Sequence, residues 1–183
     1  MAEKKPFLTD IKELRRRARE HLANGAVTQG YQGDRDAILG LLNAALATEL
    51  VCVLRYKRHH YMARGLESES IAAEFLQHAN EEEAHAAEIA KRITQLQGEP
   101  DFNPQGLLTR SHSEYVEGRT LIDMLKEDLV AERIAIDSYS EMIRYLSDRD
   151  PTTRRMFEAI LAKEEEHAED LVNLLARVAP LPS

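Results

Sequence analysis

The sequence predicts an all-α protein, an antiparallel four-helix bundle with one long crossover, plus an N-terminal helical arm. Glycine and proline are scarce, at 8 and 6 of 183 residues, while the helix-favouring residues Ala, Leu, Glu, Arg and Ile dominate. Four long segments carry apolar residues at the 3.6-residue period of a helix with one buried face. About twenty residues separate the second segment from the third, which is the connection that two antiparallel hairpins need if one crossover joins them.

The individual elements follow from local start and stop signals. Gly65 ends the first long helix, and Gly98 is a stop signal for the second. Asp123 lies in the first turn of the third helix, and the fourth opens with Asp150 as cap and Pro151 at the first helical position. The chain is predicted to consist of a basic arm and linker (1–33), one bundle domain (34–178) and a tail (179–183). The four helices of the bundle are predicted at 34–64, 68–97, 120–147 and 150–178.

Composition and charge exclude several classes of protein. The single cysteine, Cys52, excludes a disulfide framework within the chain and any four-thiolate metal site. The N-terminus has no apolar signal region and no run approaches 18 apolar residues, so we expect a cytoplasmic protein with no membrane contact. The net charge is −8, but residues 1–24 carry seven basic and four acidic side chains, leaving −11 on the remainder. We expect this arm to be an amphipathic helix that packs on a subunit, with DNA contact as the alternative.

Each of the four core-facing stripes is interrupted at mid-helix by a carboxylate. Burying unpaired carboxylates is very costly, and four of them with two neutral histidines carry −4, which two divalent metal ions would balance. In the second and fourth helices a histidine follows three residues after the carboxylate, about 5–6 Å away on the same face, so one metal ion can reach both side chains. Carboxylate oxygen with imidazole nitrogen suits iron, manganese or zinc. The residues are Glu49, Glu82, His85, Glu132, Glu164 and His167.

These residues also form an internal repeat. Glu49 and Tyr56 recur as Glu132 and Tyr139 at an offset of 83, and each Glu-x-x-His pair recurs at an offset of 82. Two hairpins related by a pseudo-twofold axis would give each metal ion a terminal glutamate and a histidine, with the two Glu-x-x-His glutamates bridging. Each Glu-x-x-His pair lies in a run of three glutamates, and in the first run Glu81 rivals Glu82 as the ligand.

Three segments resemble helix signatures of the ferritin-like superfamily, most closely those of bacterioferritin and its Dps-like relatives. They are "TELVCVLRY" (48–56), "DMLKEDLVAE" (123–132) and "ILAKEEEH" (160–167), and the resemblance extends over 34–178. It implies that the six residues are catalytic ligands of two iron ions per subunit, with manganese or zinc as alternative metals. The implied activity is that of a ferroxidase, in which Fe(II) is oxidised by dioxygen or peroxide and stored as ferric mineral inside a hollow shell.

The sequence departs from bacterioferritin at three points. Glu83 stands where bacterioferritin has its haem-binding methionine, so we expect no haem. The chain ends soon after its fourth helix, without the fifth helix of the 24-subunit cage, so we expect a homo-oligomeric shell of twelve subunits, with twenty-four as the alternative. The arm before Asp34 is longer than that of bacterioferritin, and basic arms occur in DNA-binding Dps proteins.

Four further residues are candidates for supporting the site. Tyr56 and Tyr139 are either core aromatics or donors to site carboxylates. His78 is either an additional ligand or a core histidine, and Asp128, one turn before Glu132, is a candidate acceptor for the ring N–H of a ligand histidine. Two other functions use the same sequence features: a di-iron or di-manganese peroxidase or catalase resembling rubrerythrin, and a DNA-protecting assembly.

Overall fold

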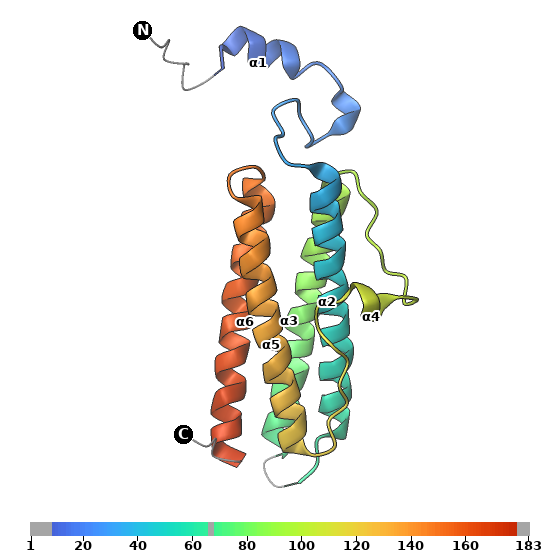
Figure 1. Cartoon of the computed structure of the whole chain (residues 1–183), viewed down its shortest axis with the longest axis vertical. Helices are drawn as coiled ribbons and strands as arrows, with labels where there is room; N and C mark the ends of the chain where they lie inside the picture. The colour runs from blue at the N-terminus through green and yellow to red at the C-terminus, as the bar shows by residue number, and fades with distance from the viewer. Residues whose placement is uncertain (1–8, 66–67, 179–183) are drawn as a thin grey trace.

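The computed structural model is all-helical over residues 9–65 and 68–178, the part of the chain that the structure describes. Four long helices form an antiparallel bundle in which α2 pairs with α3 and α5 pairs with α6 (Figure 1). Their bounds differ by at most two residues from those expected, and the predicted fold class is confirmed. The helices are α2 (Arg35–Met62), α3 (Ser68–Gln95), α5 (Leu121–Leu146) and α6 (Pro151–Val178).

Local sequence explains where these helices begin and end. Thr120 and Asp123 form a reciprocal capping box at the start of α5. Asp150 accepts a hydrogen bond from the Thr153 backbone N–H at 3.0 Å at the start of α6. After α3 ends, a Cβ at Gly98 would lie 2.4 Å from Leu39 Cδ2, so a larger residue at this position would require the Leu39 side chain to move.

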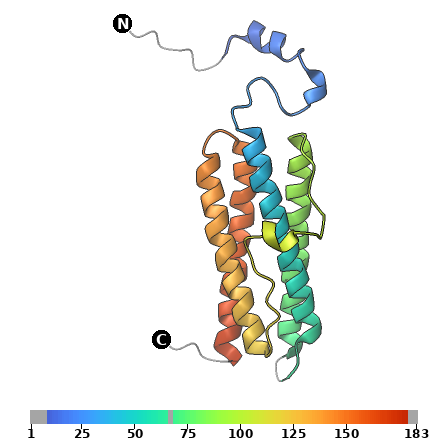
Figure 2. The same cartoon turned by 45° about the vertical axis from the view of Figure 1, so that its right-hand side comes forward.

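The crossover between α3 and α5 runs along the outside of α2 (Figures 1 and 2). It contains a short helix that the sequence did not predict, α4 (Leu107–Arg110). The backbone N–H of His112 donates to Thr48 Oγ1 at 3.0 Å, and Arg55 Nη1 donates to the carbonyl oxygen of Glu114 at 2.9 Å. Side chains of α2 therefore hold the crossover in place.

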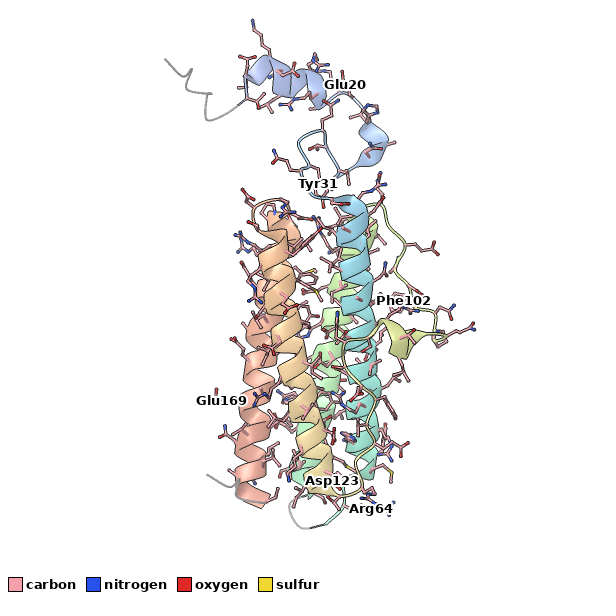
Figure 3. All side chains as sticks on the ribbon, in the orientation of Figure 1. Glu20, Tyr31, Arg64, Phe102, Asp123 and Glu169 are labelled. Atoms are coloured by element: carbon pink, nitrogen blue, oxygen red, sulfur yellow. The ribbon has the colours of Figure 1, made fainter. Side chains whose placement is uncertain are left out.

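The N-terminal segment lies beyond the end of the bundle at which α2 begins (Figure 1). Its helices are α1 (Ile11–Arg17) and η1 (Leu22–Asn24), and no residue of either is buried. The linker that follows docks on the bundle, because the hydroxyl of Tyr31 (Figure 3) donates to Asp150 Oδ2 at 2.9 Å. The basic residues of 1–8 and the predicted tail 179–183 lie outside the described residues.

The interior of the bundle consists of two apolar clusters. One includes Ile38, Leu42, Ile93 and Phe157, at the end of the bundle where α2 begins. The other includes Tyr56, Phe75, Leu125 and Leu171, towards the opposite end. Buried glutamates and a buried histidine lie between these clusters on the same helices, so a polar layer crosses the bundle at mid-height.

Two details of the core differ from the sequence analysis. On α5, Leu129, Ile136 and Ile143 are only half-buried, whereas Ala131 and Ala135 are buried and let this helix approach its neighbours closely. One described helix, α2, is long and apolar enough to cross a membrane by length and composition, although 56% of its most apolar window is buried inside the bundle. A buried core helix of a bundle passes the same test, so this is weak evidence for a membrane span. The sequence analysis did not single out this helix because it counted only uninterrupted apolar residues.

Candidate metal centre

The six predicted ligands meet in the polar layer. Glu49 comes from α2, Glu132 from α5, and each of α3 and α6 supplies a glutamate and a histidine. The four carboxylates and His167 are at most 1% exposed, and the side chain of His85 is 12% exposed. The 3.6-residue period explains this convergence, because each residue lies on the stripe that its helix turns toward the core.

The ligand atoms form two groups that share two glutamates. His85 Nδ1 lies 3.0 Å from Glu164 Oε1 and 3.4 Å from both Glu49 Oε2 and Glu82 Oε2. His167 Nδ1 lies 3.6 Å from Glu82 Oε1 and Glu164 Oε2 and 4.0 Å from Glu132 Oε2. Within each group one ligand atom per residue lies within 4.8 Å of all the others. The groups are Glu49, Glu82, His85 and Glu164, and Glu82, Glu132, Glu164 and His167.

Two tyrosines connect the hairpins symmetrically. The hydroxyl of Tyr56 on α2 donates to Glu132 Oε1 on α5, and the hydroxyl of Tyr139 on α5 donates to Glu49 Oε1 on α2. Both tyrosines are buried. Each hydroxyl therefore occupies Oε1 of one glutamate, and Oε2 of that glutamate faces the histidine of the same ligand group. Of the two alternatives for these tyrosines, the structure thus has the donor to a carboxylate.

Many polar atoms of the cluster have no hydrogen-bond partner. They are Glu49 Oε2, Glu82 Oε1, Glu132 Oε2, both carboxylate oxygens of Glu164, His85 Nδ1 and His167 Nδ1. Among the residues that the structure describes, the only cationic groups within ion-pair distance of the four carboxylates are the two histidines. An uncompensated buried charge costs about 3–5 kcal/mol, so four would consume the ~5–15 kcal/mol by which a protein is stable. The cluster therefore needs cations.

In the metal-free centre protons supply part of this positive charge. Burial opposes the charged form of each histidine, but the close carboxylates of the surrounding glutamates favour the charged ring more strongly and raise the pKa of His85 to about 12 and that of His167 to about 11. Burial and the charge of Glu82 raise the pKa of Glu49 to about 8 and hold that of Glu132 well above its usual value. Protons thus occupy positions that divalent metal ions would take.

The structure separates the roles of Glu81 and Glu82. Glu82 is 1% exposed and lies inside the cluster, whereas Glu81 is part-exposed and its Oε2 lies 2.6 Å from His167 Nε2. A carboxylate that accepts the outer ring N–H of a histidine fixes its tautomer and directs the other nitrogen toward a metal. The sequence analysis treated Glu81 only as a rival ligand. Glu81 and Glu82 lie four and three residues before His85, and both spacings place a glutamate near the histidine, so spacing alone does not decide which of them is the ligand.

Asp128 has partners other than a ligand histidine. It is fully buried, but its carboxylate accepts from Arg55 Nε at 2.8 Å and lies 2.8 Å from Nδ1 of His59, which is not one of the six ligands. Asp128 lies one turn before Glu132 on the same side of α5, where the side chains of Arg55 and His59 from α2 meet it. Sequence reasoning missed this Arg–Asp–His network, whose signal was an arginine at a core position of α2.

His78 lies directly beside the cluster. Its ring stacks on that of His167 with centroids 4.0 Å apart, and its Nδ1 lies 3.2 Å from the hydroxyl of Tyr56. Burial lowers the pKa of His78 to about 3. The sequence analysis gave His78 as either an additional ligand or a core histidine with its hydrogen bonds satisfied. Its Nε2 is buried without a hydrogen-bond partner, so the ring is not fully satisfied.

Comparisons with known proteins agree on a family. Residues 39–179 match the ferritin-like domain family. A bacterioferritin of Desulfovibrio desulfuricans is 29% identical over 167 residues, covering 84% of this chain and 89% of the relative. A nutrient stress-induced DNA-binding protein of Nostoc is 33% identical over 141 residues, covering 74% and 76%.

Solved structures show the same relationship. A dodecameric thioferritin, the bacterioferritin-related protein of Bacteroides fragilis, superposes with a TM-score of 0.78 at 31% identity, covering 81% of this chain and 89% of the other. The D. desulfuricans bacterioferritin, whose structure describes a diiron site in different catalytic states, gives a TM-score of 0.69 at 27% identity, covering 80% and 84%.

Proposed function

Since the chain belongs to the ferritin-like domain family, we propose that it oxidises Fe(II) at the buried carboxylate–histidine cluster and stores the ferric product. The observation that carries this proposal is the set of seven buried oxygen and nitrogen atoms in the cluster that lack a hydrogen-bond partner. They belong to six residues arranged as two groups that share a pair of glutamates. Bacterioferritin relatives at 29–32% identity are consistent with iron chemistry at such a site.

The donor atoms fit iron. Each group offers carboxylate oxygens and one imidazole nitrogen, the donor set that suits non-haem iron and also manganese or zinc. Two divalent ions would balance the −4 charge of the four glutamates, with Glu82 and Glu164 shared between them. Bound iron would supply the redox chemistry, with Fe(II) as the substrate and dioxygen or peroxide as the electron acceptor.

The chain's own residues have distinct tasks in this reaction. Glu49 with His85, and Glu132 with His167, would hold one ion each. Tyr139 and Tyr56 orient the terminal glutamates through their hydroxyl groups. Glu81 accepts the outer ring N–H of His167, which keeps Nδ1 directed into the cluster. The two apolar clusters above and below exclude water from the layer, which strengthens electrostatic interactions within it.

The site can be tested with charge-matched variants of the two glutamate runs. In the Glu82→Gln/Glu164→Gln double variant, aerobic oxidation of added Fe(II), followed by ferric absorbance and oxygen consumption, should fall to the rate of protein-free buffer. The control, Glu83→Gln/Glu165→Gln, removes the same charge from the exposed neighbouring positions and should oxidise at the wild-type rate. Wild-type rates in the first double variant would contradict the assignment.

The same assay distinguishes a second activity. A di-iron or di-manganese peroxidase would consume peroxide catalytically without accumulating ferric mineral, whereas storage retains many irons per chain. Measuring retained iron after repeated additions of Fe(II) and peroxide separates the two outcomes.

We also propose a closed homo-oligomeric shell of twelve subunits. The support is the structural similarity to a protein described as dodecameric, and closed symmetric shells are a common form of homo-oligomer. A native mass near twelve times 20.8 kDa would agree with this proposal, and one near twenty-four times that mass would contradict it.

Contact with DNA is a separate proposal that rests on the arm. The arm projects beyond the bundle (Figure 1). Its exposed side chains include Arg15 and Arg19. A relative at 33% identity is described as a DNA-binding protein. Phosphate contacts weaken as salt rises, so a gel shift with and without residues 1–24 across a salt series tests it. No shift at low salt would exclude DNA contact.

A further inference from the structure

We propose that Glu74, His78 and Asp170 form a third metal site, which binds a single divalent cation beside the dinuclear centre. Glu74 and His78 lie one turn apart on α3, and Asp170 faces them from α6. His78 Nε2 is 3.4 Å from Glu74 Oε1 and 3.8 Å from Asp170 Oδ2. One ligand atom from each of the three residues lies within 4.8 Å of the other two.

A hydrogen-bond chain determines which nitrogen of His78 carries its proton. The hydroxyl of Tyr56 donates its single proton to Glu132 Oε1. The oxygen of Tyr56 can then only accept from His78 Nδ1, 3.2 Å away, which places the ring proton on that nitrogen. In the neutral ring Nε2 consequently carries no hydrogen, and its lone pair is directed toward Glu74 and Asp170.

The outer side of His78 therefore presents acceptors without a donor. His78 is fully buried, and its Nε2 has no hydrogen-bond partner. The two carboxylates that face it offer only further oxygen lone pairs. A lone pair and two carboxylates that converge within coordination reach of one point are the donor set of a first-row divalent cation.

The internal repeat shows that one half of the dinuclear centre is built without such a cluster. At the offset of 82 that relates the two Glu-x-x-His pairs, His78 corresponds to Ile160 and Glu74 to Met156. Ile160 is a buried member of the apolar core, and Met156 packs against that core. The second half of the bundle thus has its metal ligands and its tyrosine without any polar counterpart of His78.

The position of the site indicates what it does for the centre. The side chains of Glu74 and Asp170 are 28% and 40% exposed, so a cation can reach them from solvent. His78 also belongs to a second candidate group with Glu132 and His167. The ring thus lies between an exposed site and the buried one, and this assigns the third site as the position that Fe(II) occupies before it enters the dinuclear centre. This role rests on the proposed function, whereas cation binding itself does not.

The test counts Zn(II), which neither oxidises nor mineralises. Equilibrium dialysis of the full-length protein, together with anomalous diffraction from zinc-soaked crystals, should show one tightly bound zinc ion fewer per chain in Glu74→Gln/Asp170→Asn than in the wild type. The matched control is Glu88→Gln/Glu169→Gln, two exposed acids on the same helices, of which Glu169 is labelled in Figure 3. It should bind as many zinc ions as the wild type.

Kinetics test the role in loading. On rapid mixing with Fe(II) and dioxygen, the first turnover in Glu74→Gln/Asp170→Asn should be several-fold slower than in the control, with the same final amount of oxidised iron. Equal zinc counts in the variant and the wild type, or no zinc at His78 in the crystals, would overturn the site. If zinc occupies His78 but no protein oxidises iron, the third site stands and the proposed function fails.

Discussion

Loading the metal-free protein with divalent metal at pH 7 should release protons into solution. Ligands bind metal in their deprotonated forms, with histidine neutral and glutamate ionised. In the metal-free centre the pKa of His85 is raised to about 12 and that of His167 to about 11, so each ring carries a proton that a metal ion must displace. Glu49, with its pKa raised to about 8, is largely protonated at pH 7, and Glu132 is shifted in the same direction.

The number of protons follows from these four groups. The two histidines and Glu49 should together release roughly three protons as two zinc ions bind, and the raised pKa of Glu132 acts in the same direction. At pH 9 Glu49 is already ionised in the metal-free protein, since this is above its pKa of about 8, so the release should fall by about one proton.

Titration calorimetry in buffers with different ionisation enthalpies measures this release directly. The observed enthalpy should change linearly with the buffer's ionisation enthalpy, and the slope gives the number of protons per chain. Glu49→Gln should release about one proton fewer than the wild type at pH 7. A release below about two protons would refute the reasoning, because the buried cluster would then hold its charge without protons or metal.

Three further predictions concern stability and affinity. The pKa values of the site histidines and of Glu49 are raised, so the folded metal-free protein holds protons that the unfolded chain loses. The Tm of the metal-free protein, measured by calorimetry, should therefore fall as pH rises from about 6.5 to about 9, and the Tm of the metal-loaded protein should change much less. Tyr139→Phe removes the hydroxyl that orients Glu49 and should weaken zinc binding by roughly 10–100-fold in a chelator competition, whereas unchanged affinity would contradict that role. Arg55→Met leaves Asp128 without its arginine and should lower the free energy of unfolding in urea by about 3–5 kcal/mol, against less than about 1 kcal/mol for Arg58→Met in a part-exposed pair.

Much of the centre was accessible from sequence because its signals are local. A carboxylate that interrupts an apolar stripe is visible in a single helix, and a histidine three residues later lies on the same face whatever the helix packs against. The repeat of Glu49 and Tyr56 as Glu132 and Tyr139 further made symmetric tyrosine donors one of two alternatives, and the structure contains these donors. Helix bounds were accessible for the same reason, since caps such as Asp150 act within one turn.

The remaining features depend on how the helices are placed against one another. Asp128 bonds Arg55 and His59 because α5 is rotated to bring that side chain toward α2, and the residue spacing along α5 does not contain this rotation. The docking of Tyr31 on Asp150 joins residues 119 positions apart, a separation at which sequence patterns carry no distance information.

The sequence by itself determined the four helices, the core faces of all but α5, and the six residues that meet at mid-bundle, because helical period and capping are properties of neighbouring residues. Only the tertiary structure decided what surrounds those six. It placed Glu81 on the outer nitrogen of His167, and it left Nε2 of His78 facing two carboxylates of α3 and α6. These contacts depend on the relative heights and rotations of packed helices, which are set by the packing of the whole core rather than by any one segment.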